Sequence, residues 1–209
     1  MSIEAVIWDF GGVFTPSPFA AAHAYARGQG AEPDAFVRIV FGDYDTDSDH
    51  AWHRLERGEI AFTVALEEIG AAAAAAGMRF DAAEMFATMV DDQVDRSIVT
   101  DFVRDLRGRG VRNAILTNNI REYGDHWRSR LAVDELFDLV VDSCLEGIRK
   151  PDPLIYERAL ERLGVEASAA VFLDDFEQNV VAARSLGMRG IVVGPDPRVA
   201  LAELDALIA

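Results

Sequence analysis

Five short apolar runs, each ending at polar or turn-forming residues, constrain the fold of this chain more than any other feature. The first run, residues 4–8, ends at Asp9, and the others cover residues 111–116, 139–141, 170–173 and 190–193. Runs of this length with breaks after them are typical of buried strands. The residues that follow the later runs are Thr117-Asn118-Asn119, Asp142-Ser143, Asp174-Asp175 and Gly194-Pro195.

Segments with helical periodicity separate the later runs. They cover Ile98–Arg107, Pro153–Leu163 and Asn179–Leu186, and each is followed by a glycine, at Gly108, Gly164 and Gly187. A glycine just past the last turn is a common helix stop. Strands that alternate with helices predict an α/β fold, a three-layer Rossmann-like core with a parallel sheet covered on both faces. Sites in such sheets form beyond the carboxyl ends of the strands, where Asp9, Thr117 and Asp174 fall.

Residues 17–95 differ from the rest of the chain because they contain no comparable apolar run. They include Ala-rich stretches at residues 19–26 and 69–76, and alanine is a strong helix former. We therefore expect a helical cap over residues 17–95, inserted above the polar edge of the sheet. The α/β core would then consist of residues 1–16 and 96–209.

The charge of the chain limits its partners. Its formal net charge is −16, from 36 acidic and 20 basic residues, which argues against nucleic acid and against an anionic membrane surface as partners. An anionic substrate would need a local positive site, and Lys150 is the only lysine in the sequence. A basic leader, an apolar run long enough to span a membrane and a second cysteine beside Cys144 are all absent, so we expect a cytoplasmic protein without disulfides.

Four short motifs follow one another at the predicted strand ends and loops. They are Asp9-Phe10-Gly11-Gly12-Val13, Thr117-Asn118-Asn119, Lys150-Pro151-Asp152, and Asp174-Asp175 followed by Asn179. In order and spacing, this set resembles the haloacid dehalogenase-like hydrolase superfamily, in its phosphatase branch with a helical cap. The surroundings of Asp9 are also similar to the N-terminal phosphatase-like domains of epoxide hydrolases.

The chemistry of these residues fits that resemblance. Asp174 and Asp175 offer hard oxygen ligands that suit Mg²⁺, and Asp9 would bind the metal with one oxygen and attack phosphorus with the other. Thr117 would donate its hydroxyl to phosphate, and Lys150 would place a positive charge between Asp9 and phosphate. The resemblance also implies that the Gly11 carbonyl binds the metal. The remaining candidates for binding a small phosphorylated substrate are Gly12, Asn118 and Asn119.

Gly11 departs from the pattern of the phosphatases, which usually carry there a second Asp that serves as general acid and base. General acid–base catalysis contributes roughly 10²–10⁴-fold, so turnover of poor leaving groups should be slow. The enzyme would then either hydrolyse substrates whose leaving groups need little help, such as acyl, aryl or sugar-1-phosphates, or use a cap residue or a metal-bound water to protonate the leaving group. Two alternatives stay open: a 2-haloacid dehalogenase, although the Asp174-Asp175 pair is unusual for a metal-free enzyme, and a catalytically weak module that binds a phospho-ligand or a protein.

Several polar residues of the cap have a simpler interpretation than a site. The alternating acids from Asp43 to Asp49 look like a calcium loop, but His50 stands where the loop needs glycine, so an exposed acidic loop is favoured. His50 and His53 form a surface or cavity pair in which one ring is a candidate for the missing acid. Arg54 and Arg57 fit a solvated helix face better than an anion site.

Asn179 is expected to pack the following helix against its loop, and Cys144 to be a small buried residue. The sequence leaves the oligomeric state open, with a homodimer among the states that it allows.

Overall fold

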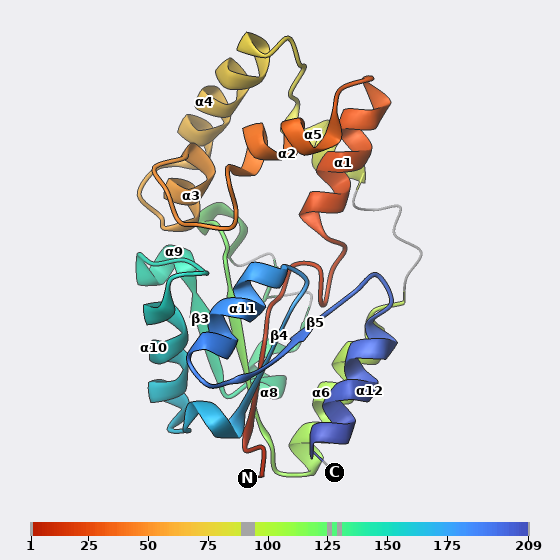
Figure 1. Ribbon diagram of the computed structural model, residues 1–209, viewed down its shortest axis with the longest axis vertical. Helices are drawn as coiled ribbons and strands as arrows, with labels where there is room; N and C mark the ends of the chain where they lie inside the picture. Colours follow the sequence, from red (N-terminus) through yellow and green to blue (C-terminus); the bar gives the residue numbers. More distant parts are fainter. Residues whose placement is uncertain (1, 89–94, 125–126, 129–130, 209) are drawn as a thin grey trace.

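Five parallel strands form the sheet in the computed structural model, which describes residues 2–88, 95–124, 127–128 and 131–208 (Figure 1). Their order across the sheet is β3-β2-β1-β4-β5, so β1 lies in the centre. The strands are β1 (Ala5–Trp8), β2 (Arg112–Thr117), β3 (Leu139–Asp142), β4 (Ala170–Asp174) and β5 (Arg189–Val192). The five apolar runs are therefore strands, as predicted, and each strand begins and ends within one residue of the predicted bounds. Thr117, Asp142 and Asp174 are the last residues of their strands rather than the first residues after them.

The two faces of the sheet are buried in separate apolar clusters. Along β1, Val6 and Trp8 belong to one cluster, whereas Ala5 and Ile7 belong to the other. The first face is covered by α6 (Ser97–Gly108), α8 (Val133–Leu136) and α12 (Pro197–Ile208). The second face is covered by α10 (Pro153–Leu163) and α11 (Glu177–Ser185). Helices on both faces of the parallel sheet confirm the expected three-layer α/β core. Burial on both faces also explains why the strands are continuous apolar runs.

One of the three predicted helix stops was placed at the wrong glycine. Gly164 ends α10 with φ of +64°, and Gly187 follows α11 with φ of +93°, as expected for glycines beyond a last turn. In contrast, α6 continues through Gly108, and the chain turns at Gly110, where φ is +79°. The amide of Val111 then donates to the carbonyl of Leu106, which starts the chain toward β2.

Between β1 and α6, five α-helices in the described residues 9–88 surround a third apolar cluster, which includes Phe36, Leu55, Ile69 and Met85. These helices, called here the helical subdomain, are α1 (Pro18–Gly28), α2 (Pro33–Phe41), α3 (Ala51–Glu56), α4 (Phe62–Ala75) and α5 (Ala82–Ala87). They lie beyond the carboxyl ends of the strands (Figure 1). The cap and core boundaries at residues 16 and 96 stay predictions.

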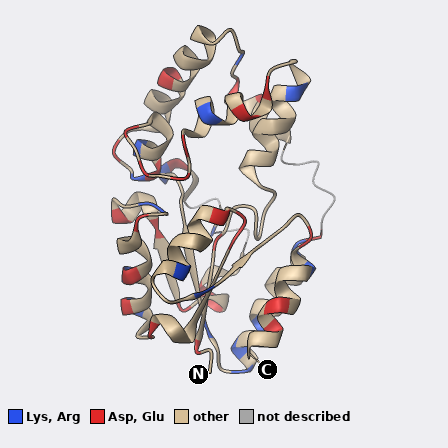
Figure 2. Ribbon diagram, in the orientation of Figure 1, with Lys and Arg blue, Asp and Glu red and all other residues tan. Residues whose placement is uncertain are grey.

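Further short elements among the described residues are η2 (Arg121–Tyr123), α9 (Ser143–Glu146) and η3 (Ala167–Ala169). Acidic residues occur on helices of both the core and the helical subdomain, with basic residues interspersed among them (Figure 2). Among the helices of the described ranges, none combines the length and the apolar character that crossing a bilayer would need.

A buried hydrogen bond joins the central strands β1 and β2. The indole nitrogen of Trp8 donates to Oδ1 of Asn113 at 3.0 Å. In the variant Asn113→Ala the indole N–H would stay buried without its acceptor, so the free energy of unfolding should fall by about 1–3 kcal/mol. Urea titration measures this loss. Adding Trp8→Phe should cost less in Asn113→Ala than in the unaltered protein, and equal costs in both backgrounds would contradict the coupling.

Candidate active site

Three carboxylates meet at the carboxyl ends of β1 and β4. Asp9 directly follows β1, and its amide donates to the carbonyl of Leu173 at 2.8 Å, which brings it level with the end of β4. Asp174 ends β4 and Asp175 follows it. One carboxylate oxygen of each residue lies within 4.8 Å of the others. The pairing of two neighbouring parallel strands therefore builds an acidic cluster from residues far apart in the sequence.

The ammonium of Lys150 lies inside this cluster. Its Nζ is 2.8 Å from Oδ1 of Asp9 and 2.6 Å from Oδ2 of Asp174, and the side chain is 1% exposed. The residue comes from the loop before α10. The only lysine of the chain thus contacts two of the three carboxylates.

Burial and charge shift the titration of these groups. Burial raises the pKa of Asp9 well above its ordinary value, although Lys150 opposes the shift. Burial and the charge of Asp174 raise the pKa of Asp175 to about 7. For Lys150, burial alone lowers the pKa, but Asp174 and Asp9 outweigh it, so its pKa rises. Three carboxylates beside one ammonium gather negative charge in a largely buried site, which a bound divalent cation would offset.

The two glycines after Asp9 differ in the space around them. A Cβ on Gly12 would lie 2.1 Å from the carboxylate of Asp175, and the residue has φ of +74°, so glycine is required there. A Cβ on Gly11 would meet nothing closer than Cδ of Pro18 at 3.8 Å. The Gly12 carbonyl accepts from Nη1 of Arg96 at 2.6 Å. Gly12 thus allows the close approach of Asp175, and its role in binding substrate stays a prediction.

Asn118, a predicted substrate ligand, holds the backbone of Lys150. Its Oδ1 accepts from the Lys150 amide at 2.8 Å, and its Nδ2 donates to the Lys150 carbonyl at 3.1 Å. The same Nδ2 lies 3.3 Å from the hydroxyl of Tyr44. The side chain of Asn118 is therefore already engaged, and its immediate effect is to fix the residue that carries the ammonium.

The neighbours of Asn118 differ in their contacts. Thr117 is buried at the end of β2, and its hydroxyl is 3.5 Å from the Asn118 carbonyl. The amide of Asn119 donates to Oγ of Ser143 at 3.0 Å, and its Oδ1 accepts from the amide of Ile120. Both residues lie on the strand-end segment beside the carboxylates, and their substrate contacts stay predictions.

Asn179 lies on α11 and fixes a carboxylate of the cluster. Its Nδ2 donates to Oδ2 of Asp174 at 3.0 Å, while the other oxygen of Asp174 accepts from the amide of Phe176 at 2.7 Å. This agrees with the expectation that Asn179 ties the helix to its loop.

The acidic loop and the histidines of the helical subdomain follow the simpler interpretation. Asp47 pairs with Arg57, and Arg54 pairs with Glu68 at 2.8 Å, so these arginines are engaged. His50 caps α3 by accepting from the amide of Trp52 at 3.2 Å.

Of the two histidines that were candidates for the missing acid, His53 fits the role poorly. The ring is fully buried, and burial together with Arg149 lowers the pKa of His53 to about 3. It is therefore uncharged at neutral pH and carries no proton suited to a general acid. Its Nδ1 lies 2.9 Å from the hydroxyl of Ser48.

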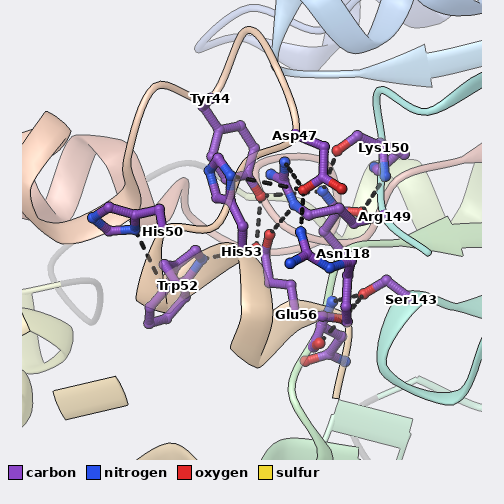
Figure 3. Close-up of polar contacts among 12 residues, drawn as sticks. Tyr44, Asp47, His50, Trp52, His53, Glu56, Asn118, Ser143, Arg149 and Lys150 are labelled. Carbon is purple, nitrogen blue, oxygen red and sulfur yellow. Dashed lines mark hydrogen bonds and ion pairs between the residues drawn. The ribbon is translucent and has the colours of Figure 1, made fainter. Parts of the chain in front are cut away.

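Sequence reasoning missed a group beside Lys150 that consists of the partly buried Tyr44 and the buried Glu56 and Arg149 (Figure 3). Nε of Arg149 donates to Glu56 at 2.7 Å, and the guanidinium lies 4.4 Å from the centre of the Tyr44 ring. Burial alone lowers the pKa of Arg149, but Glu56 outweighs it and the pKa rises. The one signal in the sequence was the position of Arg149 directly before the only lysine.

Comparisons with known proteins agree with this geometry. The family model for haloacid dehalogenase-like hydrolases matches residues 3–187. Acyl-CoA dehydrogenase family member 10 of Mus musculus is 36% identical over 99% of this chain, which spans 19% of that protein. The sesquiterpene phosphatase astK of Aspergillus oryzae is 28% identical over 91% of this chain and 89% of its own length.

Solved structures share the fold. An L-2-haloacid dehalogenase aligns with a TM-score of 0.69 at 17% identity, covering 98% of this chain and 100% of its own. A Bacteroides thetaiotaomicron enzyme of the haloacid dehalogenase family, in complex with magnesium and inorganic phosphate, aligns with a TM-score of 0.62 at 18% identity. It covers 93% of this chain and 96% of its own. Since the family model matches most of the sequence, the chain belongs to the haloacid dehalogenase-like hydrolases.

Proposed function

We propose that the protein is a Mg²⁺-dependent phosphatase that hydrolyses a small phosphorylated metabolite through an aspartyl phosphate on Asp9. The observation that carries this proposal is the ammonium of Lys150 between Asp9 and Asp174, at 2.8 and 2.6 Å. A carboxylate attacks a phosphate ester only where nearby positive charge offsets the negative oxygens. The similarity to a phosphatase over nearly its whole length supports the same reaction.

The reaction would proceed in two displacements. An Asp9 oxygen forms a bond to phosphorus while the bond to the leaving oxygen breaks, and the electron pair departs with that oxygen. Lys150 and the Thr117 hydroxyl would hold the phosphate oxygens and offset their charge. Water then attacks phosphorus, releases inorganic phosphate and restores the Asp9 carboxylate.

The donor set fits Mg²⁺, which prefers carboxylate and carbonyl oxygens. Asp9, Asp174, Asp175 and the carbonyl of Gly11 would hold the ion, which would supply positive charge to the phosphate. The magnesium and phosphate in the Bacteroides enzyme support this assignment by analogy of fold.

Gly11 narrows the substrate class. Without a carboxyl two residues after Asp9, and with His53 unsuited to the task, the leaving group would depart with little help. Acyl, aryl and sugar-1-phosphates have such leaving groups. A cytoplasmic location and a homodimer stay predictions of the sequence alone.

The first test is turnover of p-nitrophenyl phosphate with Mg²⁺ and again with EDTA. We expect phosphate release only with the metal. Asp9→Asn should retain less than about one-thousandth of the rate, because it removes the nucleophile. Asp205→Asn on α12 is the control for a lost surface carboxylate. No release from folded protein would contradict the proposal, and a halide-release assay would then separate a dehalogenase from a binding module.

Gly11→Asp should raise activity on alkyl phosphates, whose leaving groups need a proton. The nearest atom to a new Cβ is 3.8 Å away, so the loop has room for the side chain. The gain could reach the 10²–10⁴-fold that general acid–base catalysis contributes. Gly11→Asn is the matched control, with the same size and no acidic proton. Equal rates for the two variants would show that Gly11 is not the missing acid position.

Metal affinity should depend on pH because the carboxylates must lose their protons to bind Mg²⁺. With the pKa of Asp175 at about 7, this carboxyl is mostly protonated at pH 6 and mostly ionised at pH 8. The Kd for Mg²⁺, measured by titration calorimetry, should be about tenfold higher at pH 6 than at pH 8. A Kd that is constant over this range would contradict the raised pKa.

A further inference from the structure

Glu56, at the end of α3, is a buried carboxylate with three donors. Its Oε1 accepts from the Tyr44 hydroxyl at 2.7 Å and from Nε1 of Trp52 at 2.8 Å, and its Oε2 accepts from Nε of Arg149 at 2.7 Å (Figure 3). Glu56 is 3% exposed and Arg149 is 0% exposed. This ion pair joins the helical subdomain to the core.

Two routes lead from Glu56 to Lys150. The first is covalent, because Arg149 precedes Lys150 in the chain. The second passes through the Tyr44 hydroxyl to Nδ2 of Asn118 at 3.3 Å, and Asn118 binds both the amide and the carbonyl of Lys150. Glu56 is therefore linked to Lys150 in two ways: through the side chain of Arg149 and through the hydrogen bonds of Tyr44 and Asn118 to the Lys150 backbone.

The end of α3 is held against the core by its backbone as well. The Glu56 carbonyl accepts from the hydroxyl of Ser143 at 2.6 Å, and the same hydroxyl accepts from the amide of Asn119 at 3.0 Å. At Gly58, a Cβ would lie 2.4 Å from the Cys144 carbonyl. The backbone just after α3 therefore approaches the backbone of α9 closely, which only a glycine at position 58 allows.

Few contacts besides Glu56 orient the guanidinium of Arg149. Among the described residues, its terminal nitrogens make no hydrogen bond, and Nη1 lies 3.5 Å from Asp47. The hydrogen bond to Glu56, the Tyr44 ring and the ion pair with Asp47 are thus the polar and ring contacts that orient it. A buried ion pair often adds little to stability, because removing both charges from water costs about as much as their attraction gains. Its role can instead be to fix the positions of the groups that it joins.

We propose that Glu56 is a positioning residue for Lys150, acting through Arg149 and through the Tyr44–Asn118 contact. The inference rests on the proposed role of Lys150 in phosphate binding. It assigns to the helical subdomain a part in the chemistry, because α3 and the loop before it hold the catalytic lysine in place. A displacement of about 1 Å at such a group can lower the rate by about 100-fold.

The single lysine makes the test specific. Protein labelled with [¹⁵N]lysine gives one backbone amide signal in an NMR spectrum, that of Lys150, whose proton is donated to Asn118. The variants are Glu56→Gln and Tyr44→Phe, and the second keeps the ring and removes one hydroxyl. Matched controls are Glu68→Gln, which loses an exposed ion pair with Arg54, and Tyr25→Phe, which loses a hydroxyl that accepts from the amide of Asp81.

We expect the Lys150 signal to shift in both variants and to stay in place in both controls. Turnover of p-nitrophenyl phosphate should show kcat falling by up to about 100-fold in Glu56→Gln, with a smaller change in KM. An unmoved signal in folded Glu56→Gln and Tyr44→Phe would overturn the proposal, as would equal shifts in the controls or a shift with unchanged kcat. If the unaltered protein shows no phosphatase activity, the proposed function fails, and the amide signal alone decides whether Glu56 positions Lys150.

Discussion

The ammonium of Lys150 between two buried carboxylates is the interaction on which the rest of the site depends. Carboxylates in a dry site repel one another, and burial favours their protonated form. Lys150 opposes the rise in the pKa of Asp9 and also pairs with Asp174, which Asn179 and the Phe176 amide hold in place. Since the lysine comes from a loop outside the sheet, its backbone has to be fixed by other residues, and the Asn118 side chain does so.

Much of this site could be predicted because local patterns determine where strands end. Asp9, Thr117 and Asp174 lie at strand ends because apolar runs stop there, and parallel strands bring their carboxyl ends to one edge. The direction of a side chain is harder to predict. The expectation that Asn118 binds substrate stays a prediction, and no local pattern indicated that its side chain also binds the amide and the carbonyl of Lys150. These hydrogen bonds form because the loop after β2 packs against the loop before α10, and the local sequence of neither loop shows this packing.

The missed contacts are those between the helical subdomain and the core. Nothing in the local sequence of Glu56 indicates that Arg149, 93 residues further along the chain, is its partner. Similarly, His53 resembled a candidate acid because spacing says nothing about burial, which lowers its pKa to about 3. Gly110 rather than Gly108 ends the turn after α6, because either glycine satisfies the sequence rule and only the path into β2 selects one.

The central place of β1 also has a consequence for how the protein folds. Trp8 pairs with Ile115 on one side and with Leu173 on the other, so the first strand must wait for partners from the second half of the chain. Contacts between distant residues slow folding, because a long loop has to close before they form. During synthesis, the backbone N–H and C=O groups on the edge of β1 that faces β4 stay unpaired until most of the chain has been made. The newly made chain is exposed to aggregation during that interval.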